Sequence, residues 1–465
     1  MAEIVIIGTG PTGLSAAYHL EQLGFTDYIL FEKESSVGGL CRSVYQDGFT
    51  FDYTGHFLHI NDDYVRSFIT NLIGLEHFNT ITRQSFIYSR GVYTNYPFQI
   101  NLFGLPHNVI ADCIEGYIAR DQSKHCTTDS FADWVNKCFG PGFAKHFFTP
   151  YQTKIFAYDI RKISASWTGR FVPKTSLREI ICGALCAPEK SSIGYNAQFL
   201  YPLHGGIQSW LEKVAQHIKQ PIQLNTRVTH VDLKEKAVHL HNGHIEKFGY
   251  LINTMPLNCL LDCLKEKSSH RLKQATKYLK CNKVVNFNLG IKNHTLNDKH
   301  WIYYPEKHYP FYRIGFPHMF SPHMAPQHCS SLAGEFAHIN KSKMWIQKKL
   351  TESIDIVKKL FNIHDDDIIT QKIIHIQHAY VIYDFWREKH LTQLLKTLEN
   401  ESIYSAGRYA QWKYSSMQEA ILDGKEVVNK LLIKHTHKAT RNIMIKDMFI
   451  KNTYITSYNQ DMSKQ

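Results

Sequence analysis

Residues 3–32 read EIVIIGTGPTGLSAAYHLEQLGFTDYILFE, and this stretch decides the fold of the chain. Its apolar run at residues 4–7 has the length of a buried strand and is too short to span a membrane. A turn with glycines at positions 8, 10 and 13 follows, and residues 14–24 then show a helical pattern. A second apolar run covers residues 28–31. This order predicts a βαβ unit of a parallel sheet with a glycine-rich first turn.

Each glycine of this turn has a role in binding a dinucleotide. Gly8 permits the tight turn, Gly10 lets backbone N–H groups approach a pyrophosphate, and Gly13 lets the helix pack closely on the strand. The N-terminus of the helix attracts phosphate charge. Glu32 follows the second strand, where an acid can accept hydrogen bonds from an adenosine ribose. A purely structural turn is the alternative, but the strand, the helix and the acid together favour a dinucleotide.

A second glycine-rich segment favours FAD over NAD. The pair Gly38-Gly39 is followed by Arg42 shortly after the ribose-binding acid. This pattern resembles the second signature of FAD-dependent oxidoreductases of the amine oxidase clan. We expect Arg42 to pair with a phosphate, because a guanidinium binds phosphate oxygens well. The alternative is a surface turn with an isolated arginine.

Composition limits the class of protein. The 465 residues, 43% of them hydrophobic, are enough for two or three domains around a large core. The net charge of +12 suits anionic ligands. Because no basic block is interleaved with aromatic residues, we expect no nucleic-acid partner. No apolar run approaches the roughly 18 residues of a membrane helix, so we expect no membrane span.

The ten cysteines predict no metal site. Cys182/Cys186 and Cys259/Cys263 are pairs four residues apart in helical stretches, but neither has a second pair of ligands at zinc spacing. We therefore expect buried free thiols. Reduced thiols, together with a strand at the first residues in place of a signal peptide, predict a cytoplasmic protein.

Helical and strand patterns alternate in blocks, which predicts an α/β protein with inserted domains. Residues 130–156 read as aromatic-rich helices capped by Ser130, whereas 284–289, 301–304 and 311–316 read as antiparallel strands. We expect a Rossmann-like FAD-binding domain of the glutathione-reductase type with an inserted helical domain and an antiparallel β-sheet domain. The expected parts are a discontinuous FAD-binding domain over residues 1–103, 200–260 and 400–434, a helical substrate domain over 104–199, a sheet and helix substrate domain over 261–399, and a basic tail over 435–465.

Further motifs follow one another in a characteristic order. They are YPFQIN at 96–101, FFTPYQTKIF at 147–156, GYNAQF at 194–199, WIYYP at 301–305, FYR at 311–313, HAY at 378–380 and GRYAQWKY at 407–414. From residue 8 to about residue 432, the chain resembles the UDP-galactopyranose mutase family, in particular its eukaryotic-type branch. Many flavoenzymes share the glycine fingerprint, whereas the ordered set of Arg313, Tyr380, Arg408 and Tyr414 is far more specific.

These residue types also suit a nucleotide sugar on chemical grounds. Two arginines from separate segments, Arg313 and Arg408, can clamp a diphosphate with bidentate hydrogen bonds. The rings of Phe147 and Tyr151 offer a face on which uracil can stack. Taken singly, each residue has an alternative: Arg313 could form an internal salt bridge, Arg408 could be a flavin partner, and Tyr380 could belong to the core.

The resemblance implies a flavin-dependent isomerase. In that family, N5 of the reduced flavin attacks the anomeric carbon of UDP-galactopyranose, or here of a related NDP-hexopyranose, and expels UDP before the sugar closes again as a furanose. The resemblance therefore implies FAD that is active when reduced, NAD(P)H as the reductant and a nucleotide-sugar substrate, and it leaves a homo-oligomer open. The rival class is an FAD-dependent oxidase or dehydrogenase of the amine oxidase or protoporphyrinogen oxidase type.

The resemblance also assigns site residues. The catalytic set is Arg313, Arg408 and His56. The substrate-binding set is Tyr96, Gln99, Phe147, Tyr151, Gln152, Asn196, Trp301, Tyr303, Tyr380 and Tyr414. The cofactor-binding set is Gly8, Gly10, Pro11, Thr12, Gly13, Glu32, Lys33, Gly38, Gly39, Leu40, Arg42, Gly55, His56, Val228, Gly407, Arg408, Met417 and Gln418. Gln152 and Phe156 stand where the family has asparagine and tryptophan, and the segment after Tyr414 is shorter, so a deoxyhexose or an N-acetylated sugar on another nucleotide stays open.

Overall fold

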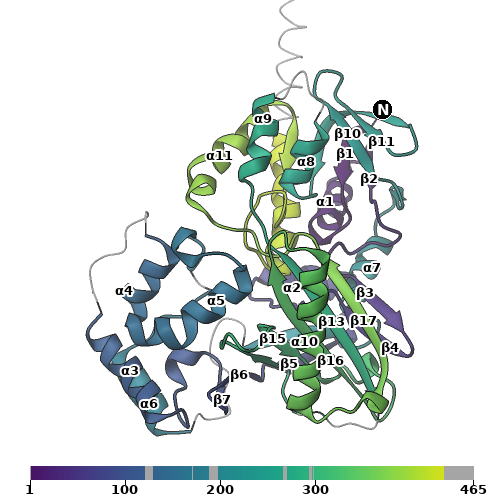
Figure 1. Ribbon diagram of the computed structural model, residues 1–465. Coiled ribbons are helices and arrows are strands. Elements are labelled where there is room, and N and C mark those ends of the chain that lie inside the picture. The colour runs from purple at the N-terminus through teal and green to yellow at the C-terminus, as the bar shows by residue number, and fades with distance from the viewer. Residues whose placement is uncertain are drawn as a thin grey trace, which may run out of the picture.

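The computed structural model describes residues 2–120, 129–169, 171–187, 197–264, 270–292, 296 and 298–433. The expected substrate-binding residue Asn196 and the expected tail over 435–465 lie outside the described residues. Three groups of elements are visible in Figure 1: a parallel sheet with α1 at the upper right, a second sheet below it, and a lobe of helices at the lower left.

The first sheet is parallel at its centre and joins distant parts of the chain. Its strands are β1 (Ala2–Ile7), β2 (Tyr28–Phe31), β9 (Ile222–Gln223), β10 (Val228–Asp232), β11 (Ala237–Leu240), β12 (Ile245–Asn253) and β18 (Ile403–Ser405). They follow the order β10-β11-β12-β1-β2-β9, and β18 pairs with β12. β1 is parallel to β2 and β12, and β12 is parallel to β18. The predicted Rossmann-like fold is confirmed by this topology.

Helix α1 (Pro11–Gln22) packs against β1 because glycine removes the side chains between them. A Cβ atom on Gly13 would lie 2.0 Å from the carbonyl oxygen of Gly8. Gly8 itself has φ +97°, a left-handed conformation that glycine adopts readily. The two residues therefore let the chain turn from the strand directly into the helix.

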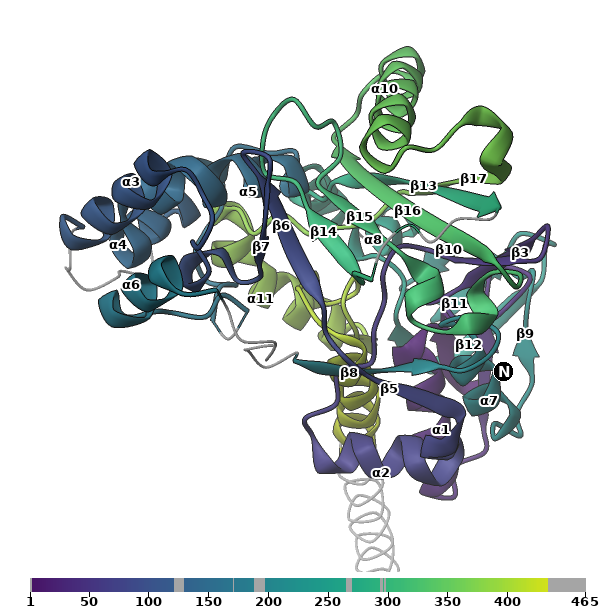
Figure 2. The same cartoon turned by 90° about the horizontal axis from the view of Figure 1, so that it is seen from below.

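The second sheet has seven strands. They are β6 (Ser85–Ser89), β7 (Val92–Asn95), β13 (Lys283–Lys292), β14 (Trp301–Tyr303), β15 (Arg313–Gly315), β16 (Cys329–His338) and β17 (Ile368–Ile376), in the order β17-β13-β16-β15-β14-β6-β7. Its pairs are antiparallel except β14 with β6. Helix α10 (Lys343–Phe361) covers one face of the sheet with Leu350 and Val357 (Figure 2).

Two features of this sheet were not expected from the sequence. The hairpin of β6 and β7, which lies in the range assigned to the FAD-binding domain, pairs with β14 instead. Strands β16 and β17 were not predicted at all. All residues of β16 except Cys329 and Ala333 are buried, so it lacks the alternation of buried and exposed residues that marks a one-sided strand.

The lobe of helices consists of α3 (His107–Ile118), α4 (Phe131–Phe143), a π-helical turn (Ala144–Phe148), α5 (Thr149–Phe156) and α6 (Leu177–Leu185). Ser130 caps α4 as predicted, in a reciprocal capping box with Asp133. The prediction of buried thiols at Cys182 and Cys186 was wrong, because Cys182 is exposed on α6 and Cys186 is exposed directly after it.

The remaining elements connect these parts. They are β3 (Ser43–Gln46), β4 (Phe49–Asp52), α2 (Asp63–Leu72), β5 (Phe78–Thr82), β8 (Gln198–Pro202), α7 (Ser209–Gln216), α8 (Leu257–Cys263), α9 (His270–Ala275), α11 (Phe385–Asn400) and a helix over residues 417–433. Over the described ranges, no helix combines the length and the apolar character that crossing a membrane requires.

Candidate active site

The two glycine-rich turns meet at the N-terminus of α1. A Cβ atom on Gly39 would lie 3.2 Å from the Cα atom of Gly10, and the N–H of Gly38 donates to the carbonyl of Thr9 at 2.9 Å. No side chain of the described residues caps α1. Its first N–H groups are therefore available to an anion, as a bound pyrophosphate requires.

Glu32 lies at the end of β2, where the sequence predicted the ribose-binding acid. Its side chain is buried and accepts from the N–H and hydroxyl of Thr9, at 3.0 and 2.9 Å, and from the N–H of Glu34 at 3.0 Å. A carboxylate has about four acceptor positions, so one remains for a ribose hydroxyl.

Other expected cofactor residues surround this turn with contacts of their own. Arg42 pairs with Glu34 at 2.9 Å and donates to the carbonyl of Gly39, so within the protein it is held by a carboxylate. Lys33 is 61% exposed and lies 3.4 Å from Glu34. Val228 is buried at the start of β10, and Leu40 is half-buried beside the core.

The C-terminal part of the chain closes the same site. Gly407 follows β18 with φ +87°, and a Cβ atom there would lie 2.5 Å from the hydroxyl of Thr12. Met417 is buried, and Gln418 accepts from the N–H groups of Asn61 and Asp62 at 2.6 and 3.0 Å. Together with the open end of α1 that starts at Pro11, these close backbone approaches fit an adenine dinucleotide such as FAD.

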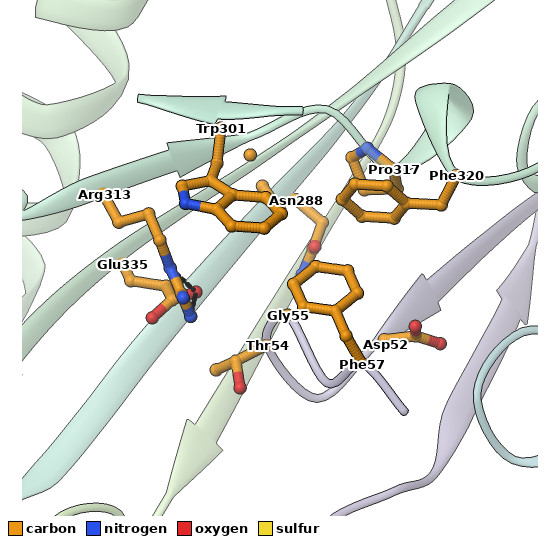
Figure 3. A pocket seen from close by; sticks show the side chains of 12 residues that line it. Asp52, Thr54, Gly55, Phe57, Asn288, Trp301, Arg313, Pro317, Phe320 and Glu335 are labelled. Carbon is orange, nitrogen blue, oxygen red and sulfur yellow. Dashed lines mark hydrogen bonds and ion pairs between the residues drawn. The ribbon is translucent and has the colours of Figure 1, made fainter. Parts of the chain in front are cut away.

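Arg313 on β15 forms a buried ion pair across the second sheet. Its Nε and Nη2 donate to Oε1 of Glu335 at 3.0 and 2.6 Å (Figure 3). The hydroxyl of Tyr312 donates to Oε2 of Glu335 at 2.6 Å. The internal salt bridge left open by the sequence is therefore present. Arg313 and Glu335 also line a small pocket with Trp301, Asn288 and the loop that holds Gly55.

Arg408 is held in a different way. Its Nη1 and Nη2 donate to the carbonyls of Ser415 and Ala379 at 2.9 and 3.3 Å, and its guanidinium carbon lies 4.8 Å from the ring centre of Tyr414 and 5.7 Å from that of Tyr380. Within the described part of the chain, no carboxylate pairs with Arg408 and its buried Nε has no hydrogen-bond partner. Buried polar atoms are normally satisfied, so this guanidinium keeps an unused hydrogen-bond donor.

His56 lies near both arginines. The pKa of His56 is lowered to about 4, mainly by burial and also by the positive charges of Arg408 and Arg313. Its Nδ1 is buried without a partner among the described residues. The imidazole is therefore neutral at pH 7, and the loop before it places Gly55 so that a Cβ there would lie 3.7 Å from Nη2 of Arg313.

A wall of aromatic rings lies beside these arginines. Tyr303 on β14 has its ring centre 5.3 Å from Tyr96 and 5.4 Å from Tyr151. Tyr151 stacks on Phe147 at 5.3 Å with the rings 8° apart. Burial strongly raises the pKa of Tyr151, with Tyr303, Tyr380 and Tyr96 raising it further and Arg313 opposing them. These predicted residues therefore belong to one site.

Some predicted substrate residues lie elsewhere or have other partners. Gln99 is 2% exposed and donates to the carbonyl of Pro173 at 2.7 Å, which ties it to the helical lobe. Trp301 stacks on Phe57 at 4.9 Å on the pocket side of β14. Gln152 is half-buried on α5.

Sequence reasoning missed Glu335, Asn288 and Asp52, which line the pocket of Arg313. Glu335 stands directly opposite Arg313 in the register of β15 and β16. An isolated acid in a mainly apolar stretch was the available signal, but its meaning depends on a strand pairing that the sequence does not reveal.

Comparisons with known proteins agree with this geometry. The family model for flavin containing amine oxidoreductases matches residues 11–432. The chain is similar to a solved structure of reduced UDP-galactopyranose mutase, with 25% sequence identity, 93% of this chain and 96% of that chain covered, and a TM-score of 0.85. A structure named as a candidate protoporphyrinogen oxidase from Exiguobacterium sp. 255-15 shares the fold, with 16% identity, 93% and 99% of the two chains covered, and a TM-score of 0.71.

Among curated proteins, the chain is 46% identical over 55 residues to a 4,4'-diapophytoene desaturase from Methylomonas sp. That match covers 12% of this chain, and the chain spans 11% of the length of that relative. The family model, in contrast, covers most of the chain, from the first turn of α1 to the closing helix. This chain belongs to the family of flavin containing amine oxidoreductases.

Proposed function

We propose that this flavoenzyme is a nucleotide-sugar mutase, which interconverts UDP-galactopyranose, or a related NDP-hexopyranose, and its furanose form. The similarity to reduced UDP-galactopyranose mutase over 93% of the chain supports the proposal. The observation that carries it is Arg408, a half-buried arginine whose buried Nε has no hydrogen-bond partner and whose guanidinium has no carboxylate partner among the described residues.

The charge of Arg408 separates the two candidate classes of substrate. Burying an unpaired charge costs several kcal/mol, and an anionic ligand recovers much of that cost. A diphosphate provides such an anion and can bind a guanidinium through two parallel hydrogen bonds. A protonated amine would be repelled, and an apolar substrate would leave the charge unpaired. The site therefore favours a nucleotide sugar over the cationic substrates of an amine oxidase.

The other residues have roles that follow from their protonation states. Arg313 would add a second positive charge to the diphosphate while Glu335 holds its guanidinium in place. Burial raises the pKa of Tyr380, so its hydroxyl stays protonated and can donate a hydrogen bond. The stacked rings of Phe147 and Tyr151 offer their edge and face to a nucleobase. Reduced flavin, bound at the glycine turns, supplies an electron-rich nucleophile.

The neutral state of His56 keeps the positive charge of this site on the two arginines. A protonated imidazole at His56 would be repelled by the positive charges of Arg313 and Arg408. We propose NAD(P)H as the physiological source of electrons, from the family resemblance, and the cytoplasm as the location, from the free thiols.

The test is an isomerisation assay with one reduction and many turnovers. The protein is reduced with dithionite without oxygen and incubated with UDP-galactopyranose and a panel of other nucleotide hexopyranoses, and products are separated by anion-exchange chromatography. We expect furanose product in large excess over enzyme from the reduced protein, little from the oxidised protein, and little from Arg408→Ala. Oxygen consumption equal to product, with no furanose, would instead assign an oxidase.

A further inference from the structure

A buried carboxylate behind the flavin-facing loop is unused by the proposed chemistry. Asp52 is the last residue of β4 and is 8% exposed. Its Oδ2 accepts from the hydroxyl of Tyr201 on β8 at 2.5 Å, and its Oδ1 accepts from the hydroxyl of Ser43 on β3 at 2.6 Å and from the N–H of Ile207 at 3.2 Å. Three elements therefore donate to one carboxylate.

All three donors to Asp52 are neutral, and no cation pairs with it within the part of the chain that the structure describes. The carboxylate also fits closely, because a Cβ atom on Gly206 would lie 2.8 Å from its Oδ1. Burial raises the pKa of Asp52 to about 6, against the effect of the three hydrogen bonds. Burying a carboxylate is unfavourable unless its hydrogen bonds are satisfied, and this satisfied carboxylate stands at the start of a loop.

The backbone of Asp52 fixes the first turn of that loop. Its carbonyl accepts from the N–H of Thr54 at 2.9 Å and from Nδ2 of Asn286 on β13 at 3.0 Å. Thr54 has φ +72°, a conformation that β-branched residues adopt only when their surroundings impose it. The turn is thus tied both to β4 and to β13 of the second sheet.

The loop carries the two residues that face the arginines. Gly55 lies against Nη2 of Arg313, and the imidazole of His56 is within the electrostatic influence of Arg313 and Arg408. Moving the turn at Thr54 would therefore move the loop relative to both guanidinium groups.

We propose that Asp52 is a positioning residue. Through its hydrogen bonds to Tyr201, Ser43 and Ile207 it holds the loop over residues 53–56 in place beside Arg313. The proposal uses the flavin assignment but not the mutase reaction. Asp52 lines the pocket of Arg313, but both of its carboxylate oxygens are engaged by Tyr201, Ser43 and Ile207, so it acts through these hydrogen bonds.

Two neutral variants separate hydrogen bonding from charge. Asp52→Asn removes the charge but can keep the network, because its amide oxygen can accept from Ser43 and Ile207 while its NH₂ donates to Tyr201, whose hydroxyl can turn toward the sulfur of Met324 at 3.3 Å. Asp52→Ala removes the charge and all three acceptor contacts. Any difference between the two variants therefore reports on positioning.

The readouts are the flavin circular dichroism between 350 and 500 nm and the flavin midpoint potential, with FAD content and melting temperature measured alongside. We expect Asp52→Asn to match the wild type in spectrum and potential. We expect Asp52→Ala to change the spectrum and to lower the affinity for reduced relative to oxidised flavin about tenfold, which is a fall of about 30 mV for a two-electron couple. The potential falls because displacing the loop weakens the stabilisation of the reduced flavin by the nearby guanidinium groups of Arg313 and Arg408.

Two further variants complete the test. Asp129→Ala removes another buried carboxylate, paired with Lys137 at 3.0 Å in the helical lobe, and should lower the melting temperature without changing the flavin signals. Tyr201→Phe keeps the charge of Asp52 and loses one donor, so it should give a smaller shift in the same direction even if Asp52→Ala fails to fold. Flavin signals that are the same in Asp52→Ala and Asp52→Asn, or unchanged in Tyr201→Phe, overturn the proposal. Neither readout depends on whether nucleotide sugars are isomerised.

Discussion

Replacing Glu335 with glutamine tests whether Arg313 contacts an anionic ligand. The side chains of Arg313 and Glu335 are 16% and 4% exposed, so the pair is buried. Removing one partner of a buried pair typically costs about 3–5 kcal/mol, because the other charge is left uncompensated. With an unfolding entropy of about 2.1 cal/mol/K per residue, a cooperative unit as large as this chain loses about 1 °C per kcal/mol. We therefore expect Glu335→Gln to melt about 3–5 °C lower than the wild type.

The ligand response then shows what Arg313 is for. In the variant, a bound diphosphate would supply the missing negative charge, so UDP should raise the melting temperature more than it does in the wild type. A ligand at about 100 times its Kd stabilises a protein by about 2.7 kcal/mol, and this value gives the scale for the wild type. The assay is differential scanning fluorimetry of the reduced and oxidised proteins over a series of UDP concentrations.

A matched control uses an exposed pair. Asp159 pairs with Arg161, whose side chain is 79% exposed, and Asp159→Asn should leave both the melting temperature and the UDP response nearly unchanged. Equal stabilisation of the wild type and Glu335→Gln by UDP would refute the reasoning, because it would mean that Arg313 does not contact the anion.

Three further outcomes are expected. Arg408→Ala should bind nucleotide sugar at least tenfold more weakly by calorimetry at unchanged FAD content, since a charge-assisted hydrogen bond contributes about 1.5–3 kcal/mol; retained affinity would make Arg408 a structural residue. Gly39→Asn tolerates the left-handed backbone but places a Cβ 3.2 Å from Gly10, so the ratio of flavin to protein absorbance should fall, whereas Gly24→Asn, with nothing within 4 Å, should keep its flavin. Burial lowers the pKa of His56 from 6.5 to about 4, so the folded state binds fewer protons than the unfolded state between these values and stability falls as pH drops through them; His56→Asn should flatten that part of the curve of melting temperature against pH, and an unchanged curve would contradict the burial of the imidazole.

The parts of the fold that the sequence predicted are those with local signals. Strand, turn and helix around Gly8 and Gly13 lie within twenty residues of each other, and Ser130 caps a helix through a residue three positions away. In each case the residues that determine the structure are neighbours in the chain.

The missing parts depend on partners far away in the chain. Strand β16 is buried on both faces, so its pattern does not distinguish a strand from a buried helix. The partner of Arg313 is Glu335, a residue of that unpredicted strand, and the partner of Gln99 is the carbonyl of Pro173. The family resemblance named candidate side chains for the site, but it did not reveal which charges are already compensated within the protein.

The order of the first sheet has a consequence for how the protein is made on the ribosome. β1 is synthesised first, yet its partner β12 ends at Asn253, and β18, which completes the parallel core, ends at Ser405. At about 5–20 residues per second, β18 emerges roughly 20–80 s after β1. Gly407, which closes on Thr12 of α1, follows only then. β2 can pair with β1 early, but the nascent chain must keep an apolar sheet incomplete throughout that time, and it can acquire its flavin only near the end of translation.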